Sequence, residues 1–470
     1  MLNRNVEGQE RYLRNYTDGD PAPLVQPWPA SGSIGAEMRG LLLSADGVYV
    51  QDAEGRQLLD GPAGMWCVNA GHRNEALIGA MTDQARSLSY NSPWYTTTRV
   101  ADTLAEALVE RAPGDLNHVF FTTGGSSAVE TGLRLMQFAN NVRGLPDKKL
   151  MVSRQGGYHG STYLTASLNG RPRDHDWMDS ASHLVRKLTA PDPFRRPAGM
   201  TIQQFEDFLV EEFADLIRLE GAERIGAFVA EPIQASGGVI VPPPGYLPRM
   251  AALCKENDIL YLSDEVVTAF GRLGSVFASS DVFGIEPDMI SFAKGVTSGY
   301  FPLGGVMVSA KLLELLRASE HDDATFSHGL TYSSHPIGCA VALKNLELLE
   351  GGGLMDNVRQ VSPLFLDGLK TLESLELVGE VRGLGLMACV ECVADRDSNN
   401  PLALDLEVGK RIDAHCQELG LLVRPIINMC VMSPPLTITA AQIGDMVEIL
   451  HKGIRLTMDD LTREGLWKGQ

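Results

Sequence analysis

The stretch Met289-Ile290-Ser291-Phe292-Ala293-Lys294 is a short apolar run that ends in a lysine, and the earlier stretch Ile259-Leu260-Tyr261-Leu262-Ser263-Asp264 ends in the same way in an aspartate. Such runs are typical of buried strands. An ammonium and a carboxylate there are costly to bury unless they are paired or take part in chemistry. In open α/β sheets the ligand crevice lies outside the carboxyl ends of the strands, so we expect Lys294 and Asp264 to face it together. These two residues alone leave a plain buried ion pair as the alternative.

From about residue 75 to 325, helical and strand-like patterns alternate. Apolar runs at 119–121, 150–152 and 225–230 precede the two runs above, and a helical pattern covers 101–111. This alternation predicts an α/β fold with a mainly parallel central sheet. The segment Gly304–Ser309 follows Lys294 too closely for a crossover helix, so we expect it to run antiparallel.

The flanking segments predict a second, smaller α+β domain. Residues 47–61 have the pattern of a hairpin with Gly55 in its turn. A predicted helix over 310–318 leads into a Gly- and Ser-rich bend, and a long helical pattern then runs from about 335 to the glycines at 351–353. We therefore expect an N-terminal segment (1–74) that packs with the small domain, a large domain (75–334) and a C-terminal small domain (335–470).

Composition and charge restrict the class of protein. With 470 residues, 44% hydrophobic and 21% charged, the chain is typical of a soluble globular protein. A net charge of −19 argues against nucleic-acid binding, which needs a basic surface. No signal peptide or membrane-spanning stretch is apparent, so we expect a cytoplasmic protein without a membrane partner. The seven scattered cysteines, including the Cys389 and Cys392 pair inside a strand-like run, predict reduced thiols and no metal site.

Other strands end in residues that could contact a cofactor. After the first apolar run, Gly124, Gly125 and Ser126 open a helix, where free N–H groups and a hydroxyl suit a phosphate, although an ordinary N-cap turn would have the same sequence. Tyr158 follows the next run, where it could stack on a flat heterocycle, and Glu231 follows the one after that. Together with Asp264 and Lys294, these residues predict one crevice suited to a cofactor that is bound as a Schiff base.

From about residue 47 to 436 the chain resembles the class III, or ω-type, pyridoxal-phosphate aminotransferases of fold type I. The most specific stretch is 262–274, followed at the family's spacing by Lys294. The resemblance implies that Lys294 joins the cofactor through an imine and then moves a proton between the substrate carbon and the cofactor. It also implies that Asp264 pairs with the pyridine nitrogen, which keeps the ring an electron sink.

The resemblance also implies the remaining cofactor contacts. Gly125 and Ser126 would hold the phosphate, and Tyr158 and Val266 would cover the two faces of the ring. Thr331 matches a threonine that reaches the phosphate of the neighbouring subunit, so the resemblance implies a homodimer with shared active sites. A tetramer built from such dimers is the alternative.

Substrate contacts follow from the same resemblance. Trp66 matches an aromatic wall of the substrate pocket, and Arg424 matches a mobile arginine that clamps the carboxylate of a keto acid. Glu231 matches an acid whose role varies within the family. The chain departs from many relatives at Gly124–Ala128, where they have Ser-Gly-Ser-Glu-Ala, and at Gln26, where they often carry histidine.

The expected activity is that of an ω-aminotransferase. An amine or ω-amino acid would give its nitrogen to the cofactor, and a keto acid, with pyruvate as the expected acceptor, would take it in a ping-pong reaction. Diamines, ω-amino acids, taurine and aryl amines are all compatible donors, and 2-oxoglutarate is the other candidate acceptor. An aminomutase or a decarboxylase of the same family is the alternative within this chemistry. A non-catalytic regulator on the same fold would be expected to have lost Lys294 or Asp264.

Overall fold

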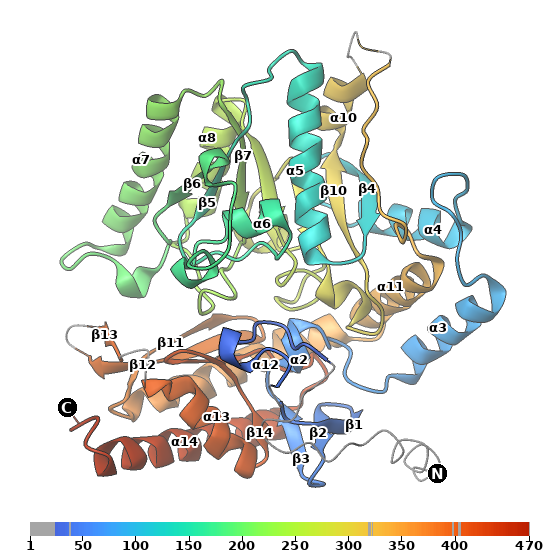
Figure 1. Ribbon diagram of the computed structural model, residues 1–470. Helices are drawn as coiled ribbons and strands as arrows, with labels where there is room; N and C mark the ends of the chain where they lie inside the picture. The colour runs from blue at the N-terminus through green and yellow to red at the C-terminus, as the bar shows by residue number, and fades with distance from the viewer. Residues whose placement is uncertain are drawn as a thin grey trace.

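The computed structural model describes residues 24–36, 39–317, 321, 323–396, 399–402 and 406–469. A seven-stranded sheet lies at its centre (Figure 1). The strand order is β4 (Leu116–Thr122), β10 (Gly304–Ser309), β9 (Met289–Phe292), β8 (Leu260–Asp264), β7 (Ile225–Ala230), β5 (Leu150–Arg154) and β6 (Val185–Leu188). Strand β10 is antiparallel to both neighbours and all other pairs are parallel. The predicted mainly parallel sheet and the antiparallel course of β10 are thus confirmed.

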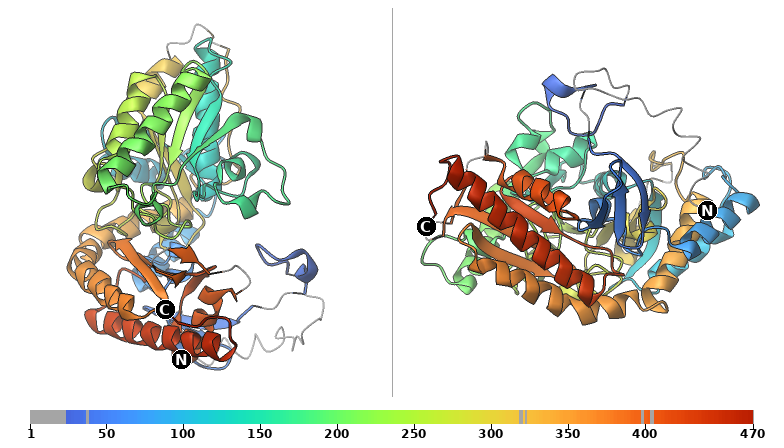
Figure 2. Two further views of the ribbon diagram at one scale, coloured as in Figure 1. Left: turned by 90° about the vertical axis from the view of Figure 1, so that its left-hand side faces the viewer. Right: turned by 90° about the horizontal axis from the view of Figure 1, so that it is seen from below.

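Helices cover both faces of this sheet, as Figure 2 shows. On β7, Val229 packs in a cluster with helix α5 (Gly125–Val142), whereas its neighbour Phe228 packs with α7 (Ile202–Glu220) and α8 (Tyr246–Glu256). Adjacent strand residues point to opposite faces, so a continuous apolar run is needed where both faces are covered. This explains why the central strands are recognisable as apolar runs.

Strand β6 was not predicted. Its sequence, Val185-Arg186-Lys187-Leu188, has two charged residues in the middle, and the strand lies at the sheet edge with only β5 as a neighbour. Edge strands face solvent and tolerate charged side chains. The apolar pattern that marks the central strands is therefore missing from β6.

A second sheet and four helices lie below the central sheet in Figure 1. This second sheet is antiparallel, and its strand order is β11 (Val378–Leu384), β12 (Met387–Asp395), β16 (Met429–Met432) and β15 (Arg424–Ile426). The short strand β13 (Asn400–Pro401) pairs with β12. The helices of this region are α11 (Pro336–Glu350), α12 (Leu354–Lys370), α13 (Val408–Glu418) and α14 (Ala440–Arg463). Helix α11 confirms the predicted helical run up to the glycines at 351–353.

The N-terminal strands join this C-terminal part. Strands β1 (Leu42–Asp46), β2 (Tyr49–Asp52) and β3 (Gln57–Asp60) form the predicted hairpin with one further strand, and β14 (Leu421–Leu422) pairs with β3 in parallel. On this basis we propose the boundaries at residues 74 and 334. The other helices are α2 (Ala63–Trp66), α3 (Glu75–Ser87), α4 (Arg99–Val109), α6 (Tyr163–Leu168), α9 (Ser279–Phe283) and α10 (Ala310–Arg317).

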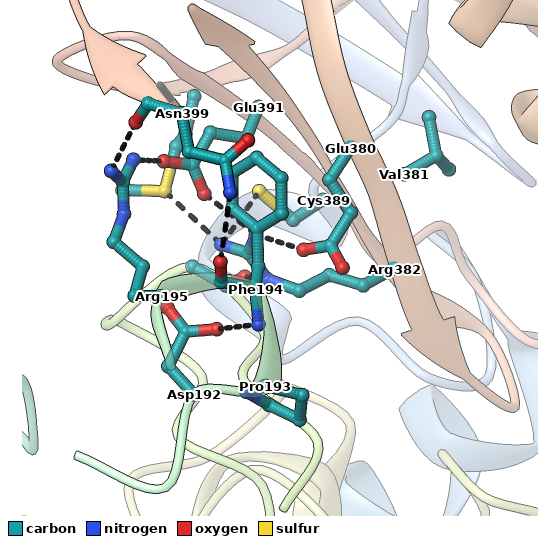
Figure 3. Close-up of polar contacts among 12 residues, drawn as sticks. Asp192, Pro193, Phe194, Arg195, Glu380, Val381, Arg382, Cys389, Glu391 and Asn399 are labelled. Atoms are coloured by element: carbon teal, nitrogen blue, oxygen red, sulfur yellow. Dashed lines mark hydrogen bonds and ion pairs between the residues drawn. The ribbon is translucent and has the colours of Figure 1, made fainter. Parts of the chain in front are cut away.

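A partly buried charged network connects the C-terminal sheet to loops of the large domain (Figure 3). Arg382 on β11 donates to carboxylate oxygens of Glu380 at 2.8 Å and of Glu391 at 2.6 Å, and its Nε donates to the carbonyl of Gly238 at 2.7 Å. Arg195 pairs with the other carboxylate oxygen of Glu391. It lies in the short 3₁₀ helix Pro193–Arg195, which follows strand β6 of the central sheet. The network fixes the loop after β7 against the C-terminal sheet.

The cysteines are all described, and all seven are free thiols. Cys389 and Cys392 are buried on β12, and burial raises the pKa of both. Among the described residues, no group of three or more His, Cys, Asp or Glu side chains is placed to hold a metal ion. None of the helices in this part of the chain is long and apolar enough to cross a bilayer.

Candidate active site

A cavity of about 720 Å³ lies at the carboxyl ends of the central strands. Of the ten residues singled out in the sequence, nine line it: Trp66, Gly125, Ser126, Tyr158, Glu231, Asp264, Val266, Lys294 and Arg424. These residues come from both halves of the chain. The structure thus brings together residues that are far apart in the sequence.

Lys294 is partly buried, lines the cavity and begins a short 3₁₀ helix (Lys294–Thr297) directly after β9. Its φ of 44° is in the left-handed region, which is strained for a side chain with a Cβ. Burial lowers the pKa of its ammonium more than the nearby Cys67 and Asp264 raise it. The amine is therefore neutral, and able to act as a nucleophile or base, at a lower pH than an exposed lysine.

The carboxylate of Asp264 is held from three sides. Its Oδ2 lies 2.8 Å from Nδ1 of His159, and its Oδ1 accepts hydrogen bonds from the Val266 amide at 3.2 Å and from the Ser291 hydroxyl at 3.3 Å. The Asn169 side chain accepts a hydrogen bond from the His159 amide at 2.7 Å. His159 was not singled out in the sequence, although it stands next to Tyr158 in Gly-Tyr-His-Gly.

The start of helix α5 opens into the cavity. Gly124 is its N-cap, and the two serines that could have capped it do not: the Ser127 hydroxyl donates back to the Gly124 carbonyl at 2.9 Å, and Ser126 Oγ accepts from the Ser161 amide at 3.0 Å. A Cβ on Gly125 would lie 3.0 Å from a methyl group of Val266. The absence of a side chain at Gly125 thus leaves free N–H groups beside a narrow space, which suits a phosphate.

Glu231 holds the loop that carries Tyr158. Its carboxylate accepts hydrogen bonds from the amides of Tyr158 and Ala235, both at 3.0 Å. Burial raises the pKa of Glu231. The Tyr158 hydroxyl lies 2.8 Å from Ser161 Oγ, so the ring is fixed at the cavity wall.

Arg424 and Trp66 form the other end of the cavity. Trp66 is buried, and the guanidinium carbon of Arg424 lies 5.3 Å from its ring centroid. Arg424 also contacts the Met65 sulfur, and no carboxylate among the described residues pairs with it. Burial lowers the pKa of Arg424 to about 10. A cation on an aromatic wall with no partner of its own can bind a carboxylate.

Thr331 is the predicted residue that does not line the cavity. It lies in an exposed turn, and its carbonyl accepts a hydrogen bond from the Tyr90 hydroxyl at 3.0 Å.

A mainly parallel sheet with a lysine at its carboxyl edge, in one cavity with a fixed carboxylate and a helix N-terminus, is the arrangement of a fold type I pyridoxal-phosphate enzyme. Residues 36–454 match the model of the family described as aminotransferase class III. The chain belongs to this family and is an aminotransferase, as the sequence predicted. The family depends on pyridoxal phosphate.

Individual relatives support this assignment. The chain is 38% identical over 440 residues to mitochondrial gamma-aminobutyrate transaminase 1 from Oryza sativa subsp. japonica. The aligned region covers 93% of this chain and 84% of the rice protein. It is similar to an (S)-enantioselective omega-transaminase from Thermomicrobium roseum (TM-score 0.87, 37% identity, 93% and 96% covered). It is also similar to the structure of an omega-transaminase from Pseudomonas jessenii in complex with PMP, with a TM-score of 0.89 and 34% identity. That alignment covers 93% of this chain and 96% of the other chain.

Proposed function

We propose that this aminotransferase holds pyridoxal phosphate in the cavity and uses Lys294 as its reactive amine. The supporting observation is that Lys294 lines one cavity with Asp264, whose carboxylate is fixed by His159. Gly125 and Ser126 would hold the phosphate group at the start of α5. Tyr158 and Val266 would cover the two faces of the ring. When bound, the cofactor supplies an electron sink for the carbanion formed on the substrate.

The residues around the ring divide the remaining work. Nζ of Lys294 would take the proton from the amine-bearing carbon of the donor and deliver it to the cofactor carbon that is bound to the nitrogen, because burial favours the neutral amine. The Asp264 carboxylate is the anionic partner for a protonated ring nitrogen, and His159 keeps it in place. Glu231 keeps the Tyr158 loop in position.

The substrates that we propose are an amine or ω-amino acid as donor and a keto acid, pyruvate, as acceptor. Arg424 would bind the carboxylate of the keto acid through two parallel hydrogen bonds while Trp66 forms the wall beside it. Its lack of a carboxylate partner within the described residues supports this role. The similarity to proteins named gamma-aminobutyrate transaminase and omega-transaminase supports a donor of this kind.

We further propose a homodimer with shared active sites. Thr331 lies outside the cavity of its own chain in an exposed turn, next to the exposed Tyr90 and Tyr332. In a dimer this turn would reach the phosphate end of the partner's cavity. Analytical ultracentrifugation of the holoenzyme tests this: a monomer would contradict the proposal, and a tetramer would place two such dimers together.

The activity is tested by spectroscopy on the holoenzyme. An amine donor should bleach the absorbance of the lysine-bound cofactor, and pyruvate should restore it with release of alanine. The Lys294→Arg variant should lose at least about a hundredfold in turnover, the lower range of general acid–base contributions. Release of carbon dioxide without alanine would favour a decarboxylase, and an isomerised amino acid without keto-acid consumption would favour an aminomutase.

A further inference from the structure

The active-site cavity contains more arginine side chains than are needed to bind one substrate carboxylate. Arg171, Arg173 and Arg424 all line it, and Asp174 is the carboxylate that lies with them. Arg171 uses Nε and one terminal nitrogen to donate to a single oxygen of Asp174, at 2.9 and 2.7 Å. Arg173 and Arg424 form no ion pair with any described residue. Within the described part of the chain, these two guanidinium groups thus have no carboxylate in ion-pair contact.

The remaining carboxylates of the cavity are occupied elsewhere. Glu231 is bound by backbone amides, and Asp264 is bound by His159. Neither makes a hydrogen bond or an ion pair with an arginine of this group. Neither Glu231 nor Asp264 therefore serves as the ion-pair partner of Arg173 or Arg424.

The three guanidinium groups are close enough to influence one another. After burial, the charge of Arg171 is the next cause that lowers the pKa of Arg424, and Arg173 acts in the same direction. Arg171 is fixed by its contacts with two rings, 4.8 Å from the centroid of Tyr158 and 5.6 Å from that of Trp28. Like charges held together in a cavity repel, and a bound anion relieves this repulsion.

Arg171 and Arg173 are separated from Arg424 by their position in the fold. Arg173 lies in the short 3₁₀ helix Pro172–Asp174, on the Tyr158 side, whereas Arg424 lies on β15 over Trp66. Arg173 keeps all its N–H donors available, and it is solvent-accessible at the cavity mouth. A ligand can therefore reach it without breaking an existing ion pair.

We propose that Arg171 and Arg173 form a second anion-binding subsite, which receives the remote anionic group of the amine donor and leaves Arg424 for the keto acid. The subsite rests on the proposed function and makes the preferred donor an ω-amino acid or an amino sulfonate. An uncharged amine gains nothing from it. A diamine would bring a second cation close to the arginines, which repel it. Its one available acceptor there would be Asp174 Oδ1, which is buried and has no hydrogen-bond partner among the described residues.

Donors matched in length test this subsite. The kcat/KM of the holoenzyme is measured with pyruvate and with 4-aminobutanoate, 3-aminopropane-1-sulfonate, butan-1-amine or butane-1,4-diamine. We expect Arg173→Gln to lower kcat/KM about tenfold for the carboxylate and sulfonate donors, mainly through KM, since hydrogen bonds to charged groups are among the stronger ones. The loss for butan-1-amine should stay below about threefold, and Arg173→Lys should recover part of the difference.

Arg218→Gln is the control, because Arg218 is an exposed arginine on α7 that is not among the residues lining the cavity. Equal losses for all four donors, or an unchanged kcat/KM for 4-aminobutanoate, would overturn the subsite. A preference of the wild type for the diamine would also overturn it. Failure of the proposed function is distinct, because then no donor would bleach the cofactor absorbance.

Discussion

Nδ1 of His159 lies 2.8 Å from Oδ2 of Asp264, and both side chains are buried. His159 follows Tyr158 after β5, and Asp264 ends β8, so the contact joins residues that the sequence separates widely. The histidine orients the carboxylate that we propose as the partner of the cofactor ring nitrogen. It is a positioning residue that acts through Asp264.

Replacing His159 tests this role. We expect His159→Leu to lower kcat/KM about 10- to 100-fold, the range of one hydrogen bond to a charged group. His159→Asn should recover part of the loss, because its amide nitrogen can occupy the place of Nδ1. The absorbance spectrum of the bound cofactor should change in the leucine variant. The same variants of the exposed His183 are the control, and equal activity of the leucine and asparagine variants at 159 would contradict the role.

Gly125 should be needed for cofactor retention. In Gly125→Ala the new Cβ would lie 3.0 Å from one methyl group of Val266 and 3.2 Å from the other. Overpacking of this kind costs about 1–3 kcal/mol, so we expect the dissociation constant of pyridoxal phosphate to rise about tenfold. Gly79→Ala, in helix α3 with no atom within 4 Å, should leave it unchanged. Tight retention in the Gly125 variant would show that the phosphate lies elsewhere.

Glu265 should make stability depend on pH. Burial raises the pKa of its carboxyl group to about 7, although hydrogen bonds from Ser279 and Ala278 act to lower it. The folded protein therefore keeps a proton that the unfolded chain releases above about pH 4.3. This contribution to stability is complete below that pH and is lost as the pH rises through 7.

The comparison with Glu265→Gln isolates this effect. Between pH 4.5 and 7.5, the free energy of unfolding of the wild type should fall by up to about 3 kcal/mol relative to the variant. Denaturant unfolding at several pH values measures it. Parallel pH profiles of the two proteins would mean that Glu265 is already ionised in the folded state at low pH.

Arg382 should be important for stability. In Arg382→Met, the buried Glu391 keeps Arg195 but loses its second cation, and Gly238 loses its donor. We expect a loss of about 3 kcal/mol or more in the free energy of unfolding, as for other broken buried ion pairs. The double variant Arg382→Met/Glu391→Gln should recover part of it. Arg218→Met, whose partner carboxylates are exposed, should unfold almost as the wild type does, and an equally small effect at Arg382 would contradict the prediction.

The sequence was most informative where burial leaves a pattern. The runs that end at Asp264 and Lys294 are recognisable because both faces of their strands are covered, which favours apolar residues at most positions. Strand β6 was not predicted because an edge strand tolerates charged side chains, here Arg186 and Lys187. The serines after Gly124 could equally have capped α5, but in the structure their hydroxyls bond to the Ser161 amide and the Gly124 carbonyl instead.

The sequence alone was enough to predict the alternation of helices and strands, and to identify Lys294, Asp264 and the residues that resemble the family's site. The folded structure was needed to show that His159 contacts Asp264, that Arg171 and Arg173 share a cavity with Arg424, and that Arg382 binds the loop after β7. The physical reason is that apolar periodicity is a local property of the chain. Hydrogen bonds and unbalanced charges depend on which distant residues the packed sheets bring within a few ångströms.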